Sequence, residues 1–320
     1  MPNIERGGTM ELVAGPCSIT PENIKDILQL SQIRVKNLHG IEQPALWGTR
    51  MVELKSRTAL DPSGEGMGIG CHTVMENMLI LTDGGSSQDF KIPESVNMMK
   101  KVIEDTELTV ATEVMMPSVQ VPIYEKVIPD GKMLLWNPSV EQLGWSILPM
   151  AVAAKRHNWE IGLKNGKWLG ATLKDAEQSD SPVETNLEKT WVGLTTFATA
   201  MGLPKSKITL IHRGVDIPEK GEFRNIPIHE VARRAKRKIG GGVKLYFDPS
   251  HTFGPNLRDQ IVEGTVQAML MKDGNEWLYD GALIEAGTAP TDTGQHLTIN
   301  EMESLAKELA KYRNLRASQK

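Results

Sequence analysis

Apolar runs short enough to be strands recur along this chain, and most are separated by segments that read as helices. The runs lie near residues 12–16, 46–54, 108–114, 133–136, 160–164, 207–212, 244–248 and 282–286. Strands that alternate with helices are typical of parallel sheets. Eight such runs in one direction predict a (β/α)8 TIM barrel. Because such barrels commonly occupy about 200 to 250 residues as one domain, we interpret the whole chain as a single barrel domain.

Three of the intervening segments carry particular helix signals. Residues 21–28 follow Thr20, a suitable N-cap, and place Pro21 at the first helical position. Residues 228–239 form the second predicted helix. Residues 299–312 have apolar positions at helical spacing and predict a C-terminal helix that closes the last unit of the barrel.

Two long connections interrupt this pattern, near residues 59–93 and 170–190. Both are rich in Gly, Ser, Asp and Pro, and both predict long loops. Barrel enzymes often use such loops to cover substrate. A variable surface loop has the same composition, so the sequence leaves both interpretations open.

Charge and cysteine content narrow the class of protein. The formal charge is −4, from 36 basic and 40 acidic residues, which gives no broad positive field for nucleic acid or an anionic membrane. Two cysteines are too few for a disulfide framework and favour a reduced cytosolic setting. No apolar run approaches the length of a spanning helix, roughly 20 residues, and the N-terminus lacks a signal-peptide pattern. We therefore expect a cytoplasmic protein that binds neither nucleic acid nor membrane.

Chemically active side chains follow the ends of the predicted strands, which converge on one face of a barrel. One set offers sulfur, nitrogen and oxygen ligands suited to a divalent transition ion such as Mn, Fe, Co or Zn. Its members are Cys17, His251, Glu285 and Asp292. A second set is cationic and suits a substrate with phosphate or carboxylate groups. Its members are Arg50, Lys55, Arg57, Lys164 and Arg213.

Each of these residues also has a simpler explanation when taken alone. A cysteine such as Cys17 is usually a small buried hydrophobe, and His251 after Pro-Ser suits a hydrogen-bonded turn. Lys55 and Arg57 suit a solvated loop. Glu285 is different, because it ends an apolar run where an unpaired carboxylate would be costly to bury. The recurrence of such residues at successive strand ends favours a functional site.

As a set, these strand ends resemble the metal-dependent 3-deoxy-D-arabino-heptulosonate 7-phosphate (DAHP) synthases, relatives of the 3-deoxy-manno-octulosonate 8-phosphate synthases. The likeness runs discontinuously from residue 14 to residue 295. It rests on Ala14-Gly15-Pro16-Cys17-Ser18, the segment from Arg50 to Thr58, Thr112-Glu113-Val114, Leu163-Lys164-Asn165-Gly166, Ile211-His212-Arg213-Gly214, Arg224-Asn225-Ile226-Pro227, Asp248-Pro249-Ser250-His251, Ile284-Glu285 and Asp292-Thr293-Gly294-Gln295. The histidine before Arg213 resembles a subgroup in which some members carry a chorismate mutase domain.

The resemblance implies a role for each matching residue. Cys17, His251, Glu285 and Asp292 are implied as metal ligands. Arg50, Lys55, Lys164 and Arg213 are implied to hold phosphoenolpyruvate, with Asp248 also in the substrate site, and Arg57 and Thr58 to receive the aldose phosphate. Lys55, Glu113 and His251 are the expected catalytic residues.

The implied reaction joins phosphoenolpyruvate and erythrose 4-phosphate to give DAHP and phosphate, the first step of the shikimate pathway. The Lys-x-Arg-Thr form favours this four-carbon acceptor over arabinose 5-phosphate. The resemblance also implies a homo-oligomer, and chorismate mutase is a candidate partner.

The sequence departs from the family at three places. The Gly-Ala-Arg that follows the fourth strand is missing, and Leu135-Trp136-Asn137-Pro138 stands there. The family's Glu-Val-His after the eighth strand is replaced by Glu285-Ala286-Gly287, with a shorter gap to Asp292. Residues 64–96 have no counterpart. Two alternatives therefore stay open: a synthase that uses another aldose phosphate, such as arabinose 5-phosphate, and a catalytically silent barrel that binds metabolites.

Overall fold

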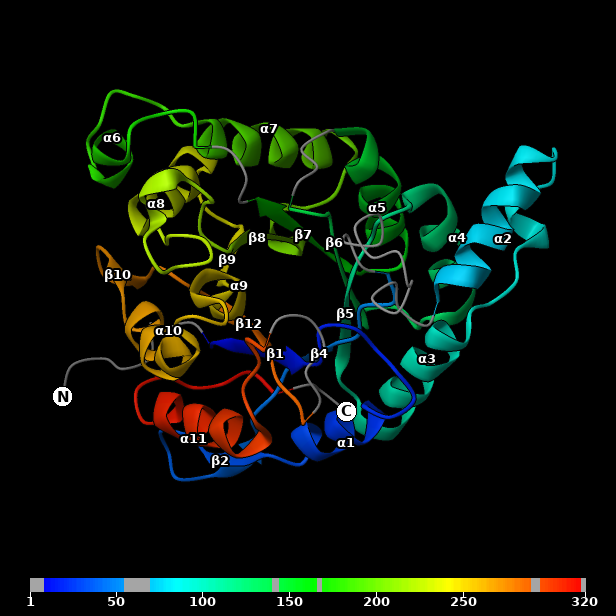
Figure 1. Cartoon of the computed structure of the whole chain (residues 1–320), viewed down its shortest axis with the longest axis horizontal. Helices are drawn as coiled ribbons and strands as arrows, with labels where there is room; N and C mark the ends of the chain where they lie inside the picture. The colour runs from blue at the N-terminus through cyan, green and yellow to red at the C-terminus, as the bar shows by residue number, and fades with distance from the viewer. Residues whose placement is uncertain (1–8, 55–69, 140–143, 166–168, 289–293, 318–320) are drawn as a thin grey trace.

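The computed structural model describes residues 9–54, 70–139, 144–165, 169–288 and 294–317, and in these the strands form a closed parallel barrel (Figure 1). Their order around the barrel is β1-β12-β9-β8-β7-β6-β5-β4, and β1 pairs with both β12 and β4 to close it. The bounds are β1 Glu11–Gly15, β4 Gly48–Arg50, β5 Thr109–Glu113, β6 Met133–Trp136, β7 Glu160–Asn165, β8 Ile208–His212, β9 Lys244–Phe247 and β12 Gly281–Glu285. Each falls on a predicted apolar run, so the predicted (β/α)8 barrel is confirmed.

Helices surround the strands as an outer layer (Figure 1). They are α1 Ile24–Ser31, α2 Cys71–Thr82, α3 Glu94–Thr106, α4 Pro117–Val127, α5 Gly144–Arg156, α6 Leu173–Glu177, α7 Asn186–Ala200, α8 His229–Ile239, α9 Pro249–Phe253, α10 Ile261–Met269 and α11 Ile299–Ala310. Short 3-10 helices cover Ser87–Asp89, Lys205–Lys207, Pro218–Lys220 and Arg258–Gln260. Two small antiparallel hairpins pair β2 Arg34–Lys36 with β3 Glu42–Pro44, and β10 Lys272–Asp273 with β11 Glu276–Trp277. Within the described residues, no helix combines the length and the apolar character needed to cross a bilayer.

The first predicted helix starts later than the sequence suggested. The side chain of Asn23 accepts the N–H of Thr20 at 2.9 Å and donates to the carbonyl of Ser18 at 2.7 Å. These bonds fold residues 18–23 into a turn, so α1 begins at Ile24 rather than at Pro21. The two other predicted helices are present as α8 and α11.

The two connections predicted as long loops contain helices. Residues 71–82 form α2, which lies beside α4 outside the main ring (Figure 1). In the second connection, the hydroxyl of Thr172 caps α6, and Thr185 forms a capping box with Glu188 at the start of α7. The loop prediction is wrong for all three helices. For α6 and α7 the reason is that side-chain caps start helices within a polar composition, whereas α2 starts without a side-chain cap. Residues 59–69 lie outside the described part of the chain.

The inside of the barrel has its own small core, formed by the residues that point inward from each strand. Its members are Val13, Trp47, Val52, Ala111, Leu134, Trp136, Ile211, Tyr246 and Leu283. At the N-terminal ends of the strands this core ends in charged residues. Lys244 places its Nζ 2.9 Å from carboxylate oxygens of both Glu11 and Glu160. This ionic layer forms the floor of the barrel. A functional site is therefore expected at the opposite end, where the strands have their carboxyl ends.

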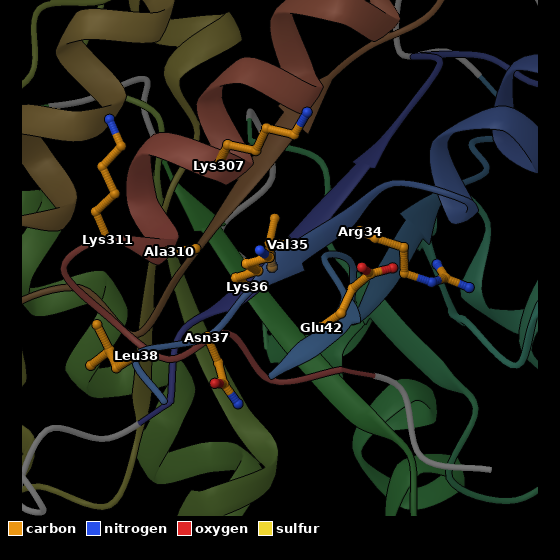
Figure 2. A pocket seen from close by; sticks show the side chains of 9 residues that line it. All are labelled: Arg34, Val35, Lys36, Asn37, Leu38, Glu42, Lys307, Ala310 and Lys311. Atoms are coloured by element: carbon orange, nitrogen blue, oxygen red, sulfur yellow. The ribbon is translucent and has the colours of Figure 1, made fainter. Parts of the chain in front are cut away.

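A cavity of about 640 Å³ lies between β2 and the C-terminal end of α11, on the floor side of the molecule (Figure 2). Figure 2 shows Lys307 of α11 and Lys311, the residue after that helix, extending away from Leu38. Their ammonium groups pair with Glu303 and Glu308 of the same helix. These lysines suit the C-terminal end of a helix and do not converge on one point in the cavity.

Candidate active site at the carboxyl ends of the strands

Three ligand-type side chains meet where β1, β12 and β9 end. Cys17 follows β1, Glu285 ends β12, and His251 lies in α9 directly after β9. One ligand atom from each lies within 4.8 Å of the other two, and all three residues are buried. Sulfur, imidazole nitrogen and carboxylate oxygen together are a donor set for a divalent transition ion.

The local sequence explains how these side chains reach one point. Gly15 pairs in register with Glu285, and a Cβ at Gly15 would lie 2.7 Å from the carbonyl oxygen of Arg50. A glycine is therefore required for β1 to approach β4 this closely just before Cys17. On the other side, Asp248 accepts the backbone N–H of His251 at 3.2 Å and caps α9, whose first residue is a proline.

Asp248 also orients the imidazole. His251 Nδ1 lies 3.0 Å from Asp248 Oδ1, and Nε2 lies 3.5 Å from Glu285 Oε1. An imidazole that donates from Nδ1 presents the lone pair of Nε2 to a metal ion. Burial lowers the pKa of His251 to about 3, against the opposing charge of Asp248, so the ring is neutral near pH 7.

Glu285 is held from several sides. Its Oε2 accepts a hydrogen bond from Gln295 Nε2 at 3.0 Å, and its backbone N–H donates to Ser250 Oγ at 2.9 Å. Arg50 Nη2 lies 3.3 Å from Glu285 Oε1 and 3.5 Å from Cys17 Sγ. Burial disfavours the charge on Arg50, but the acidic neighbours outweigh it and raise the Arg50 pKa. The guanidinium therefore stays charged against the ligand cluster.

Arg50, Lys164 and Arg213 bring positive charge to the same end of the barrel. Lys164 Nζ pairs with Asp248 Oδ2 at 2.8 Å, and burial lowers the pKa of Lys164. Among the described residues, Arg50 Nε and Nη1 and Arg213 Nε are buried without a hydrogen-bond partner. Buried donors are normally paired, so these N–H groups are suited to a bound anion.

Glu113 ends β5 beside this cationic cluster. Its charge opposes the effect of burial on the pKa values of Lys164 and Arg213 and adds to the raised pKa of Arg50. A half-buried carboxylate at this position can accept a hydrogen bond from water.

Four of the predicted site residues lie outside the described part of the chain. They are Lys55, Arg57, Thr58 and Asp292. Their proposed roles stay predictions, while Cys17, His251, Glu285, Arg50, Lys164, Arg213, Asp248 and Glu113 come together as described above.

Sequence reasoning missed part of the site. Gln295 holds Glu285, and the side chain of Arg224 donates to Gln295 Oε1. Ser139 accepts a hydrogen bond from Arg213 Nη1. Gln295 and Arg224 belong to motifs noted in the sequence, but nothing in their residue types indicated these contacts.

Fold and site together define a (β/α)8 barrel with a candidate metal cluster and a candidate anion-binding cluster at its carboxyl end. No protein-family model and no curated protein matches the chain. Among solved structures, the fold is similar to that of a phospho-2-dehydro-3-deoxyheptonate aldolase (DAHP synthase) from Thermotoga maritima. The TM-score is 0.63 at 15% sequence identity, over 95% of this chain and 69% of that one. At this identity the likeness establishes the fold.

Proposed function

We propose that this barrel catalyses a metal-dependent, aldol-type condensation of phosphoenolpyruvate with erythrose 4-phosphate, giving DAHP and phosphate. The observation that supports this most is the direct contact between the two clusters. Arg50 touches both Cys17 and Glu285, while its remaining buried N–H groups face no protein acceptor among the described residues. A site for a metal ion thus adjoins a site for an anion.

Cys17, His251 and Glu285 would hold the ion, and Asp292 is the predicted fourth ligand. Their mixed donor set suits Mn, Fe, Co or Zn. When bound there, the ion supplies Lewis-acid polarisation of the aldehyde carbonyl. Asp248 fixes the ring of His251, and Gln295 fixes the carboxylate of Glu285.

The cations would hold the two anionic substrates together despite their repulsion. C3 of phosphoenolpyruvate forms the new carbon–carbon bond to the aldehyde carbon of erythrose 4-phosphate. Water adds at C2, and phosphate leaves with the C2–O bond electrons. Lys55 is assigned the proton transfer to the developing alkoxide, and Glu113 the positioning of the water.

The test is the formation of phosphate and 3-deoxy sugar acid by metal-stripped protein, with and without added Mn²⁺. We expect turnover with erythrose 4-phosphate only when metal is restored. Turnover with arabinose 5-phosphate instead would keep the proposed reaction type and identify a different acceptor substrate. Metal binding without turnover of either aldose phosphate would contradict the proposal and favour a metabolite-binding barrel.

A further inference from the structure

The end of β6 and the residues after it are one of the three places where the sequence departs from DAHP synthases, because Gly-Ala-Arg is absent there. In the structure this segment, Trp136 to Ser139, reaches each of the described cations of the anion site. The ring of Trp136 lies 5.7 Å from Arg50 Cζ and 5.7 Å from Lys164 Nζ. At the other end of the segment, the hydroxyl of Ser139 accepts a hydrogen bond from Arg213.

Asn137 fixes the main chain of Lys164. Its Oδ1 accepts the N–H of Lys164 at 2.9 Å, and its Nδ2 donates to the carbonyl of Lys164 at 3.1 Å. The side-chain amide of Asn137 therefore bonds to both the backbone N–H and the backbone carbonyl of Lys164, as a peptide group of an adjacent strand would. The end of β7, which carries Lys164, is thereby tied to the end of β6.

Trp136 itself points into the barrel and is 1% exposed. Gly162 on β7 makes room for it, since a Cβ at Gly162 would lie 2.9 Å from the Trp136 Cβ. The indole Nε1 has no hydrogen-bond partner among the described residues. A buried indole N–H normally finds a partner, so this donor is suited to a ligand.

Of the other buried donors that lack a partner among the described residues, three belong to side chains that this segment contacts. They are Arg50 Nε and Nη1, on a side chain that faces the Trp136 ring, and Arg213 Nε, on a side chain held by Ser139. Several N–H donors on neighbouring side chains, left without protein acceptors, match the several oxygens of a phosphate or a carboxylate.

We propose that Trp136 is a substrate-binding residue whose indole N–H donates to an oxygen of the bound anion. Asn137 and Ser139 are positioning residues for Lys164 and Arg213. Where the resemblance predicts an arginine, this segment thus supplies a neutral N–H donor and two side chains that position neighbouring cations. This deepens the proposed function and rests on it for the identity of the anion as phosphoenolpyruvate.

The direct test compares phosphoenolpyruvate and inorganic phosphate binding, by calorimetry, in the wild type, Trp136→Phe and Trp47→Phe. Phenylalanine keeps an aromatic face and removes the N–H. Trp47 is a matched control, because it also lies in the inner core, but beside Lys244 and Arg316 at the floor. We expect about tenfold weaker phosphoenolpyruvate binding for Trp136→Phe and no change for Trp47→Phe.

A second pair of variants tests positioning. Ser139→Ala removes the acceptor for Arg213, and Ser139→Thr keeps a hydroxyl. If turnover is present, we expect the alanine variant to raise KM for phosphoenolpyruvate several-fold with little change in kcat, and the threonine variant to restore it. Equal thermal stability of the two variants would separate this effect from a loss of fold.

The outcomes distinguish this proposal from the proposed function. Wild-type protein that binds phosphoenolpyruvate without turnover would contradict the reaction, and the Trp136→Phe comparison would still decide the role of the indole. Unchanged binding in Trp136→Phe would overturn the role of Trp136. Failure of the wild type to bind either anion would overturn it as well.

Discussion

Arg50 serves both halves of the site with one guanidinium. Its Nη2 pairs with Glu285 and contacts the sulfur of Cys17, and its Nε and Nη1 have no acceptor among the described residues. Because a guanidinium is planar and rigid, a shift of the metal ligands moves the anion donors as well. Metal and anion binding should therefore be coupled in this protein.

The sulfur ligand can be tested with the chain's other cysteine as a control. We expect Cys17→Ser to lose at least tenfold in affinity for Zn²⁺ or Mn²⁺ and to lose turnover, since a hydroxyl is a much poorer ligand than a thiolate. Cys71→Ser changes a buried thiol in α2 that is not a member of the cluster, and should retain both. Metal stoichiometry by mass spectrometry and the phosphate-release assay are the measurements. Full metal content in Cys17→Ser would contradict the assignment.

Residue type decided which parts of the site could be predicted. Cys17, His251 and Glu285 carry chemistry that is conspicuous after an apolar run, so the strand-end pattern indicated them. Trp136 and Asn137 are ordinary residues in a barrel interior. The roles proposed for them depend on the register between β6 and β7, which brings Trp136 beside Gly162, and a linear pattern does not contain that information.

At the scale of elements, one buried ion pair holds several helices on the outside of the barrel. Arg234 of α8 donates from Nε to Glu188 of α7 at 3.0 Å and from Nη2 at 2.9 Å. Its Nη1 donates to the carbonyl of Ala176 at the end of α6 at 3.1 Å. Glu188 also completes the capping box of α7 with Thr185. The segment 170–190 is thus ordered by contacts with α8.

The ion pair between Glu188 and Arg234 makes the stability of the protein fall at acid pH. Burial alone would raise the pKa of Glu188, but Arg234 and the Thr185 cap lower it from 4.5 to about 2. The unfolded chain binds the proton more tightly, so the contribution is complete above about pH 4.5 and is lost as pH falls toward 2. We expect the urea midpoint to fall over this window.

Glu188→Gln provides the comparison for that prediction. The variant leaves Arg234 without its buried counter-charge and should be less stable at pH 7 by about 3 kcal/mol. Its urea midpoint should fall less steeply between pH 4.5 and pH 2 than that of the wild type. An identical pH profile in both proteins would show that Glu188 does not carry this dependence.

Strands were easier to predict than connections for a physical reason. A barrel strand is covered on both faces, so its sequence is a short apolar run that stands out. The starts of α6 and α7 depend on single hydroxyl groups, at Thr172 and Thr185, within segments that look like loops. Asn23 likewise delays the start of α1 through its side-chain bonds.

At the scale of the whole molecule, the ionic layer and the candidate active site lie at opposite ends of the barrel. Its floor is an ionic layer around Lys244, Glu11 and Glu160, and its other end holds the candidate active site. The predicted homo-oligomer and the predicted chorismate mutase partner concern surfaces outside this arrangement, and both stay predictions.

Removing the floor cation should destabilise the protein without altering the site. Lys244→Met removes the cation that Glu11 and Glu160 share, and only Glu11 keeps a second partner, Arg316. We expect a loss of about 3 kcal/mol in unfolding free energy. Metal content and phosphoenolpyruvate affinity should be unchanged at temperatures where the variant is folded. Lys101→Met breaks an exposed pair with Asp105 and should change stability by less than about 1 kcal/mol. Altered ligand affinity in Lys244→Met would show that the two ends of the barrel are not independent.

The pairing of β1 with both β12 and β4 also means that the barrel is closed by strands from opposite ends of the chain. Met10 and Leu315 form a bridge, and the Met10 N–H bonds to the carbonyl of Asn314 at 2.8 Å. A short peptide could therefore join Met10 to Leu315, and new ends could be opened between other βα units. Such a circularly permuted chain would assemble the same strand ends around the same site.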